Sequence, residues 1–237
     1  MSPRRVPVSR RDRPAKPPLS LEGTVAAALA IMREEGLERL TMRRLAAELD
    51  TGPASLYVYV RNMAELHAAI LDELLGTVAP PPAGGDWRER LEQVLTDYTV
   101  MLFQHPSLAR SALVARPRGQ HYLNLVETLL ALLDEGGVPP AQAAWGLDLL
   151  LQFGTAAAAE QGTREESLDA EDEWDAMLLA LHTTSPQAHP HVAALAPLLV
   201  SGEPGQRMSW GFRMLINGIL ATPVPVPPAG SRPADPC

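Results

Sequence analysis

The chain has 237 residues, of which 46% are hydrophobic and 5% aromatic, and its net charge is −8. No apolar run is long enough to cross a bilayer, no hydrophobic segment follows the N-terminal arginines as in a secretory signal, and the only cysteine is Cys237. These features exclude an internal disulfide framework and a cysteine metal cluster, and we expect a cytoplasmic protein of one large or two smaller domains.

Charge is distributed unevenly along the chain. Residues 1–18 carry a net charge of +5 and the first 62 residues +4, which leaves −12 on residues 63–237. Residues 1–18 hold six cations and five prolines, so we predict a disordered basic arm there. Flexible basic arms follow the DNA minor groove, and a basic end on an acidic body favours a nucleic-acid partner. The alternative interpretation is a solubilising tail.

A first helix is expected directly after the arm. Ser20 is its predicted N-cap, and Gly36 is its predicted end. Its apolar stripe is formed by Val25, Leu29 and Met32. Leu37 and Leu40 are expected to complete a small three-helix core.

Residues 41–62 have the layout of a helix-turn-helix. Thr41 is the predicted N-cap of a helix through residue 49, and residues 50–52 form a turn in which Gly52 can take backbone angles closed to other residues. Pro53 opens a second helix that is predicted to extend over residues 54–60, with Leu56 and Val60 facing inward. Asn62 is the predicted N-cap of the next helix.

The rest of the chain also has helical patterns and no alternating pattern of useful length, so the fold class is predicted to be all-α. Helices are expected over residues 63–78, 86–104, 105–115, 120–135, 139–160, 172–181, 191–200 and 204–220. A mobile loop is predicted over residues 161–173, and Pro80–Gly85 is either a domain linker or only a loop. The predicted domains are 19–66 for DNA binding and 67–221 for regulation, followed by a disordered proline-rich tail over 222–237.

No pattern in the sequence indicates catalysis. His182, His189 and His191 form the only histidine cluster, which has no nearby carboxylate and no metal-ligand spacing. There is no nucleophile elbow, no phosphate-binding glycine loop and no HExxH motif. We therefore predict no enzymatic activity, no metal and no cofactor.

A resemblance to a known family lies in residues 19–66, LSLEGTVAAALAIMREEGLERLTMRRLAAELDTGPASLYVYVRNMAEL. The segments LTMRRLAAEL, SLYVYV and RNxxEL occur in the order and spacing of the TetR (tetracycline repressor) family of transcriptional regulators. The later segments GGDW, ARP and QFG are similar to those of the tetracycline-repressor branch. Asp50 stands where the family usually has a glycine, and Met63 stands where a lysine is usual.

The resemblance implies a homodimeric repressor that binds a palindromic double-stranded DNA operator and is released by a small molecule. In the helix-turn-helix motif the second helix enters the major groove. Base edges are expected to meet Pro53, Ala54, Ser55 and Val58, and also Arg43, which is expected to reach either a guanine or a phosphate. Phosphates are expected to meet Thr41, Tyr57, Tyr59, Arg61 and the helix end at Asn62. For Tyr57 and Tyr59 the alternative is a core position.

The resemblance also implies a set of residues around the ligand. They are Val94, Tyr98, Ala112, Arg116, Leu125, Thr128, Leu129, Leu147, Leu151 and Gln152. Ala112 stands where the tetracycline-repressor branch uses a histidine for magnesium, so no metal–tetracycline chelate is expected. The alternative for each residue is core packing or a loop contact.

Pairs of C-terminal helices are expected to build the homodimer, through the alanines at 156–159 and through Trp210, Met214 and Ile219. The alternative is that both groups belong to the core of one subunit. The alternative function is a DNA-binding architectural or co-regulatory protein without a small-molecule ligand.

Overall fold

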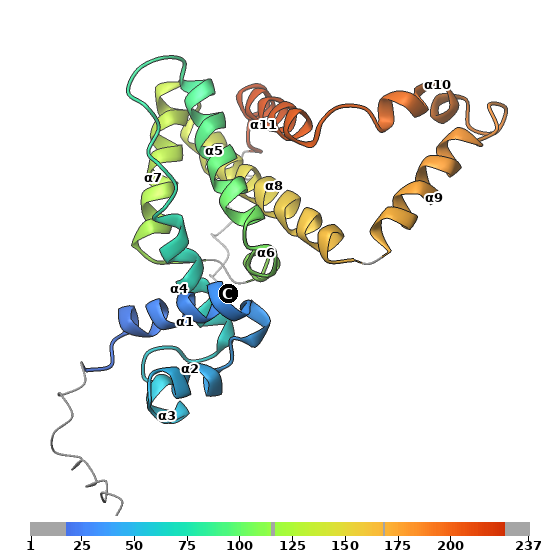
Figure 1. Cartoon of the computed structure of the whole chain (residues 1–237). Helices are drawn as coiled ribbons and strands as arrows, with labels where there is room; N and C mark the ends of the chain where they lie inside the picture. Colours follow the sequence, from blue (N-terminus) through green and yellow to red (C-terminus); the bar gives the residue numbers. More distant parts are fainter. Residues whose placement is uncertain (1–17, 115–116, 168, 226–237) are drawn as a thin grey trace, which may run out of the picture. The chain divides into compact units, whose positions relative to one another are not determined.

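The computed structural model describes residues 18–114, 117–167 and 169–225, and every regular element within them is a helix (Figure 1). The predicted all-α fold class is thus confirmed. The helices are α1 (Leu21–Glu35), the 3₁₀ helix η2 (Leu37–Arg39), α2 (Met42–Glu48), α3 (Pro53–Leu56), α4 (Met63–Leu75), α5 (Trp87–Phe103), α6 (Pro106–Ala112), α7 (Gln120–Glu135), α8 (Pro140–Glu166), α9 (Ala170–His182), α10 (Pro190–Leu199) and α11 (Pro204–Ala221). The predicted arm, except Pro18, and residues 226–237 of the predicted tail lie outside the described residues.

The chain forms two compact units, Met1–Leu66 and His67–Cys237, so the division falls inside α4. In the first unit, α1 starts where the Ser20 hydroxyl accepts a hydrogen bond from the Gly23 amide at 3.0 Å. It ends at Gly36, whose φ of 88° is a left-handed angle that suits glycine. The predicted stripe of α1 is buried, and Leu45, Leu56 and Val60 are fully buried with it.

The second unit is a helical bundle arranged along α8. This long helix packs against α5, α6, α7 and α11. Close approach to α11 needs glycine, because a Cβ at Gly211 would lie 2.5 Å from the Phe153 ring and one at Gly146 would lie 2.6 Å from Ile219. The Phe153 and Phe212 rings meet edge to face, with centroids 5.1 Å apart. These contacts fix α11 along α8.

Helices α9 and α10 form an arm that extends away from the α5–α8 bundle (Figure 1). They pack against each other. No residue of α9 is buried, and several large apolar side chains on both helices are exposed. Helices α9 and α10 therefore expose apolar side chains to solvent.

Two predicted elements differ from the structure. The loop predicted over 161–173 is wrong, because α8 continues to Glu166 and α9 begins at Ala170. Polar pairs four residues apart support this extra length, with Arg164 bonding Glu160 at 2.6 Å and Gln161 bonding Glu165 at 2.9 Å. The second helix of the helix-turn-helix is also shorter than predicted, since α3 ends at Leu56 and residues 57–59 form a turn.

Candidate functional site

The turn between α2 and α3 is built around Asp50. Its φ of 49° places a non-glycine residue in the left-handed region, while Gly52 has an ordinary extended φ of −84°. The positive φ thus falls on Asp50, which stands where the family usually has a glycine, and Gly52 does not use its conformational freedom. The turn closes where the Thr51 amide donates to the Ala46 carbonyl at 2.9 Å. Pro53 then starts α3 directly after Gly52.

A mostly uncharged surface is exposed on and after α3. Pro53, Ala54 and Ser55 are exposed, and Val58 is 79% exposed. Since Leu56 and Val60 are fully buried on the opposite side, the helix offers small, apolar and hydroxyl groups to a partner. Tyr57 is 51% exposed, so its surroundings leave both the ring and the hydroxyl accessible.

Polar groups surround this surface. Thr41 accepts the Arg44 amide at 3.0 Å and keeps its hydroxyl hydrogen for another acceptor. Asn62 accepts the Glu65 amide at 2.8 Å and so caps the start of α4, as predicted. Arg61 pairs with Glu65, and this hydrogen bond raises the pKa of the Arg61 guanidinium. Arg61 therefore stays charged while its side chain remains exposed.

The two arginines of α2 differ in their surroundings. Arg43, which is predicted to contact DNA, is exposed. Arg44 bonds Glu35 at 2.6 Å and Glu48 at 2.8 Å, and the hydrogen bond from Arg44 lowers the pKa of the Glu35 carboxyl. Arg44 thus joins α1 to α2.

Tyr59 differs from the other candidates for DNA contact. It is half-buried, and its hydroxyl donates to the Leu19 carbonyl at 2.6 Å. The single hydroxyl hydrogen is therefore committed within the protein, and a hydrogen bond from Tyr59 to a phosphate would require breaking this contact.

The predicted ligand residues line two separate cavities of the second unit. The first, here called the α5–α8 cavity, has a volume of about 270 Å³ and includes the predicted residues Tyr98, Ala112, Leu151 and Gln152. The second, here called the α4–α7 cavity, has a volume of about 210 Å³ and includes the predicted Val94, Leu125 and Thr128. The single predicted site is thus divided in this structure.

Two of the predicted ligand residues that the structure describes line neither cavity. Leu129 is fully buried and Leu147 is 9% exposed, so both take part in core packing. Arg116 lies outside the described residues.

Sequence reasoning missed other lining residues. In the α5–α8 cavity they are Leu113, Pro117, Tyr122, Asp148, Thr155 and Ala156. Asp148 and Ala156 flank Gln152 at i−4 and i+4, so helical spacing from that residue is the signal that would have found them.

A chain of hydroxyl groups forms the polar side of the α5–α8 cavity. Thr155 donates to the Leu151 carbonyl at 2.8 Å, and the Tyr98 hydroxyl lies 2.6 Å from the Thr155 oxygen. Because the Thr155 hydrogen is already used, Tyr98 is the donor of this second bond. Gln152 is exposed at the cavity edge, where it bonds Asp148 at 2.5 Å.

Helix α4 holds both ends of the connection between α6 and α7, which contributes to the cavity wall. His67 Nδ1 lies 3.1 Å from the Ser111 hydroxyl near the end of α6. Asp72 accepts the Tyr122 amide at 2.9 Å at the start of α7, and a Cβ at Gly119 would lie 2.0 Å from its Oδ2. Hydrogen bonds thus connect α4 to the chain on both sides of the wall.

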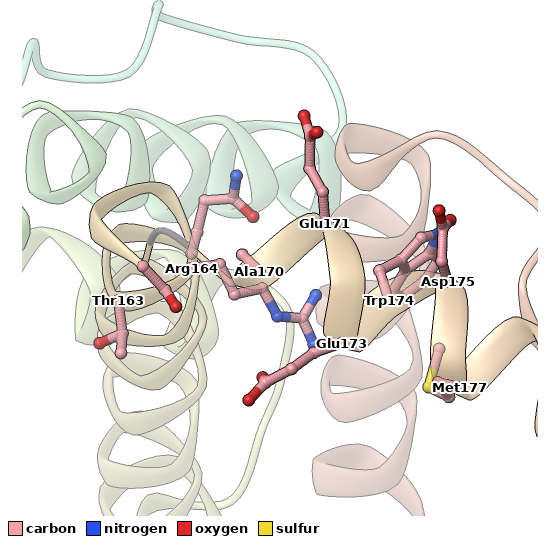
Figure 2. Close-up of a pocket in the computed structure, with 10 residues that line it drawn as sticks. Thr163, Arg164, Ala170, Glu171, Glu173, Trp174, Asp175 and Met177 are labelled. Carbon is pink, nitrogen blue, oxygen red and sulfur yellow. The ribbon is translucent and has the colours of Figure 1, made fainter.

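A larger pocket of about 650 Å³ lies between the end of α8 and α9, and Figure 2 shows Arg164 extending from α8 toward α9. The Arg164 guanidinium lies 5.9 Å from the centre of the Trp174 ring. None of the predicted ligand residues lines this pocket. In the part of the chain that the structure describes, no three histidine, cysteine or acidic side chains gather to hold a metal, and His182, His189 and His191 are exposed.

Comparison with known proteins assigns the two units. The family described as "Bacterial regulatory proteins, tetR family" matches residues 25–70, and the family described as "Tetracyclin repressor-like, C-terminal domain" matches residues 79–222. The chain belongs to the TetR family. Its class is that of a DNA-binding transcriptional regulator, as the helix-turn-helix predicted.

Three TetR-family relatives illustrate the similarity. The transcriptional repressor DrrR1 of Streptomyces coeruleorubidus is 32% identical over 67% of this chain, and the match spans 59% of DrrR1. The structure of the transcription regulator SCO7704 from Streptomyces coelicolor is 57% identical, with a TM-score of 0.78, and covers 90% of this chain and 100% of its own. The structure of ActR from Streptomyces coelicolor in complex with actinorhodin is 36% identical, with a TM-score of 0.76, and covers 86% and 97%.

The family matches contain every predicted DNA residue, within residues 25–70, and the whole lining of the α5–α8 cavity, within residues 79–222. The α4–α7 cavity also includes Leu75, Gly76 and Val78, which lie between the two matches. Among the described residues, no helix of this TetR-family chain has the length and apolar character that a bilayer crossing requires.

Proposed function

We propose that this TetR-family protein is a homodimeric repressor that binds a palindromic operator and leaves it when a small organic molecule occupies the α5–α8 cavity. The proposal rests on the hydrogen bonds from α4 to both sides of the cavity wall, which join His67 to Ser111 and Asp72 to Tyr122. Helix α4 begins in the unit that contains the helix-turn-helix. A ligand that moves the wall also moves α4.

The chemistry of the lining indicates the class of ligand. Leu113, Pro117 and Tyr122 contribute apolar surface to the lining, while Tyr98 contributes a hydroxyl and Gln152 contributes an amide. This combination suits an organic molecule with an apolar body and a few hydroxyl or carbonyl groups. The solved complex of ActR with actinorhodin supports a ligand for this chain as well, and makes actinorhodin a practical probe.

DNA reading is proposed to depend on the uncharged surface at α3 for sequence and on the surrounding polar groups for affinity. Ser55 hydrogen-bonds base edges, and Val58 and Ala54 contact thymine methyl groups. Arg61, Thr41 and the amide end of α4 meet phosphates.

Substitutions separate these two roles. Arg61→Ala is expected to weaken binding to all sequences equally, whereas Val58→Ala removes a thymine contact and lowers discrimination at one base pair by roughly 1–3 kcal/mol. Titration of an operator and of random duplex DNA, each at two salt concentrations, measures both effects. Equal losses on the two DNAs for Val58→Ala would contradict the assignment.

Release is tested by adding compounds to the protein–operator complex. Actinorhodin and a library of aromatic hydroxy compounds are titrated while operator occupancy is followed. A compound that releases the wild-type protein should lose potency about tenfold with Tyr98→Phe, since one hydrogen-bonding group is worth about 1–1.5 kcal/mol. Thr128→Val, in the α4–α7 cavity, is the matched control. Operator affinity unmoved by every compound would favour a regulator without a ligand.

A further inference from the structure

The Glu65 carboxylate on α4 holds both the backbone and the side chain of Arg61. Its Oε2 accepts from the Arg61 amide at 2.6 Å and from Nε at 3.2 Å, and its Oε1 accepts from Nη2 at 3.2 Å. The Glu65 amide donates to the Asn62 side chain at 2.8 Å, which fixes the acid in the first turn of α4. A helical carboxylate whose side chain is only 24% exposed therefore orients the arginine that precedes its helix.

The pairing uses one edge of the Arg61 guanidinium. A guanidinium has five N–H donors in a rigid planar fork. The Nε donor and one Nη2 donor face Glu65, so the edge formed by Nη1 and the other Nη2 donor points away from the carboxylate. The Arg61 side chain is 74% exposed, which leaves room for a second anion at that edge. Two parallel N–H donors match two oxygens of a phosphate.

Arg61 lies beside the surface on and after α3 that is proposed to read DNA. Val58, three residues earlier, is 79% exposed, and Asn62, the next residue, caps the start of α4. The N-terminus of a helix attracts anions through its free amides and its dipole. The second edge of the guanidinium is therefore placed where a phosphate of bound DNA would approach.

A carboxylate beside an arginine that binds phosphate has two opposing effects. It repels the phosphate, and it also orders the arginine before DNA arrives, so that less side-chain entropy is lost on binding. Salt weakens the repulsion, because exposed charges are screened over about 8 Å at physiological ionic strength, whereas the contacts at 2.6 and 3.2 Å are too short for much screening. Ordering is therefore the larger effect near physiological salt.

We propose that Glu65 is a positioning residue, which holds the Arg61 guanidinium by one edge and presents the other edge to a DNA phosphate. The proposal rests on the proposed DNA binding and on the proposed phosphate contact of Arg61. Lysine does not suit this arrangement, because an ammonium is a point charge without a second planar edge.

The test is a double-mutant cycle in the full-length protein, with mixed-sequence duplex DNA as the probe. The four proteins are wild type, Glu65→Gln, Arg61→Ala and the combination. Glu65→Gln should weaken DNA binding roughly threefold in the presence of the arginine. In the Arg61→Ala background it should bring no loss, and removal of the negative charge should raise affinity by at most about twofold. The amide of residue 61 is present in both backgrounds, so damage to the backbone bond would appear equally in both.

Two further comparisons separate geometry from charge. In an Arg61→Lys background, which keeps the positive charge, Glu65→Gln should not weaken binding. The matched control is Glu48→Gln, which removes an acid from another pair four residues apart in the same unit, that of Arg44 and Glu48. It should not weaken binding, because Arg44 is not proposed to contact DNA. Repeating each titration at higher salt should reduce the effects of charge and retain the loss caused by Glu65→Gln.

Three results would overturn the proposal. An equal loss in the wild-type and Arg61→Ala backgrounds would show that Glu65 only supports the turn. A gain in affinity that requires Arg61 would show that the carboxylate competes with phosphate, and an equal loss in the Arg61→Lys background would show that the second edge is not used. Failure of the proposed function is distinguishable, since the wild-type protein itself would then not bind DNA.

Discussion

Asp50 holds the turn of the helix-turn-helix in a conformation that favours glycine. The departure from the family pattern, which usually has glycine here, could be recognised from the sequence. The sequence left open which residue of the turn takes the positive φ, because a glycine in a turn only permits that angle and does not require it. The bond from Thr51 to Ala46 determines which residue takes that angle, and such a contact is not visible in composition.

Replacing Asp50 by glycine should stabilise the protein. Removing the Cβ relieves the left-handed strain at φ 49°, and we expect the free energy of unfolding to rise by about 0.5–1 kcal/mol. Asp50→Ala is the control, because its Cβ stays and it should bring no gain. Urea denaturation measures both, and equal stability of the two variants would refute the role of strain.

His67 should make stability depend on pH. Ser111 donates its hydroxyl hydrogen to the Ser107 carbonyl, so it accepts from His67 Nδ1, and the unprotonated Nε2 is buried and has no hydrogen-bond partner in the described structure. Burial lowers the pKa of the His67 imidazole. The unfolded chain therefore binds the proton more readily than the folded protein.

This contribution to stability is complete above a pH of about 6.5 and is lost as the pH falls below it. His67→Asn keeps a donor for Ser111 and cannot titrate, so it should flatten the decline, whereas replacement of the exposed His191 by glutamine should not. Denaturation curves between about pH 7 and pH 5 compare the three proteins. A parallel decline in wild type and His67→Asn would show that another group is responsible.

At the scale of elements, most helix starts could be predicted and two helix ends could not. Ser20, Asp86 and Asn62 cap helices as their sequence context indicated, because an N-cap is a local signal. The end of α8 depends on tertiary contact, since a Cβ at Gly162 would lie 2.0 Å from Pro106 of α6. Polar composition alone suggested a loop there.

Helix α7 has a cap that no local sequence pattern reveals. Gly119 at its N-cap position has no side chain to accept the first amides, and Asp72 of α4 accepts them instead. Asp72→Ala should lower the free energy of unfolding by about 1–2 kcal/mol, because it removes both a cap and a negative charge at a helix N-terminus.

Hydrogen exchange of the His121 and Tyr122 amides locates the effect, and urea denaturation measures its size. Asp72→Asn, which keeps one acceptor oxygen, should retain part of the stability. If the two amides exchange no faster in Asp72→Ala than in wild type, the cap is not the source of any loss.

At the scale of the whole molecule, the sequence predicted the regulator class, and its predicted ligand residues line two cavities of the described structure. The family resemblance gives positions along the chain, whereas side-chain packing decides which residues share a cavity. Tyr98 and Val94 are one turn apart on α5, yet they line different cavities. Of the three α11 residues predicted for the dimer, Trp210 and Met214 are exposed at 67% and 50%, whereas Ile219 is buried.

The proposed dimer should depend on Trp210. Trp210 and Met214 are exposed on α11, and Trp145 and Leu149 are exposed on α8, which packs against α11. We propose that a second copy covers these apolar side chains. Trp210→Asp should shift the protein to monomers in analytical ultracentrifugation and weaken operator binding at least about tenfold, since one half-site is lost. Leu21→Asp, on the first unit, should leave the dimer intact. An unchanged sedimentation profile for Trp210→Asp would place the interface elsewhere.

The positions of the tryptophans have an optical consequence. Trp145, Trp174 and Trp210 are exposed, Trp87 packs over Gly136, and no tryptophan lies in residues 1–66. The intrinsic emission of an unlabelled sample therefore originates entirely in the second unit. Burial of the α8 and α11 indoles against another subunit moves that emission to shorter wavelength. Tryptophan fluorescence can therefore report on subunit assembly, and no tryptophan belongs to the first unit, which contains α3.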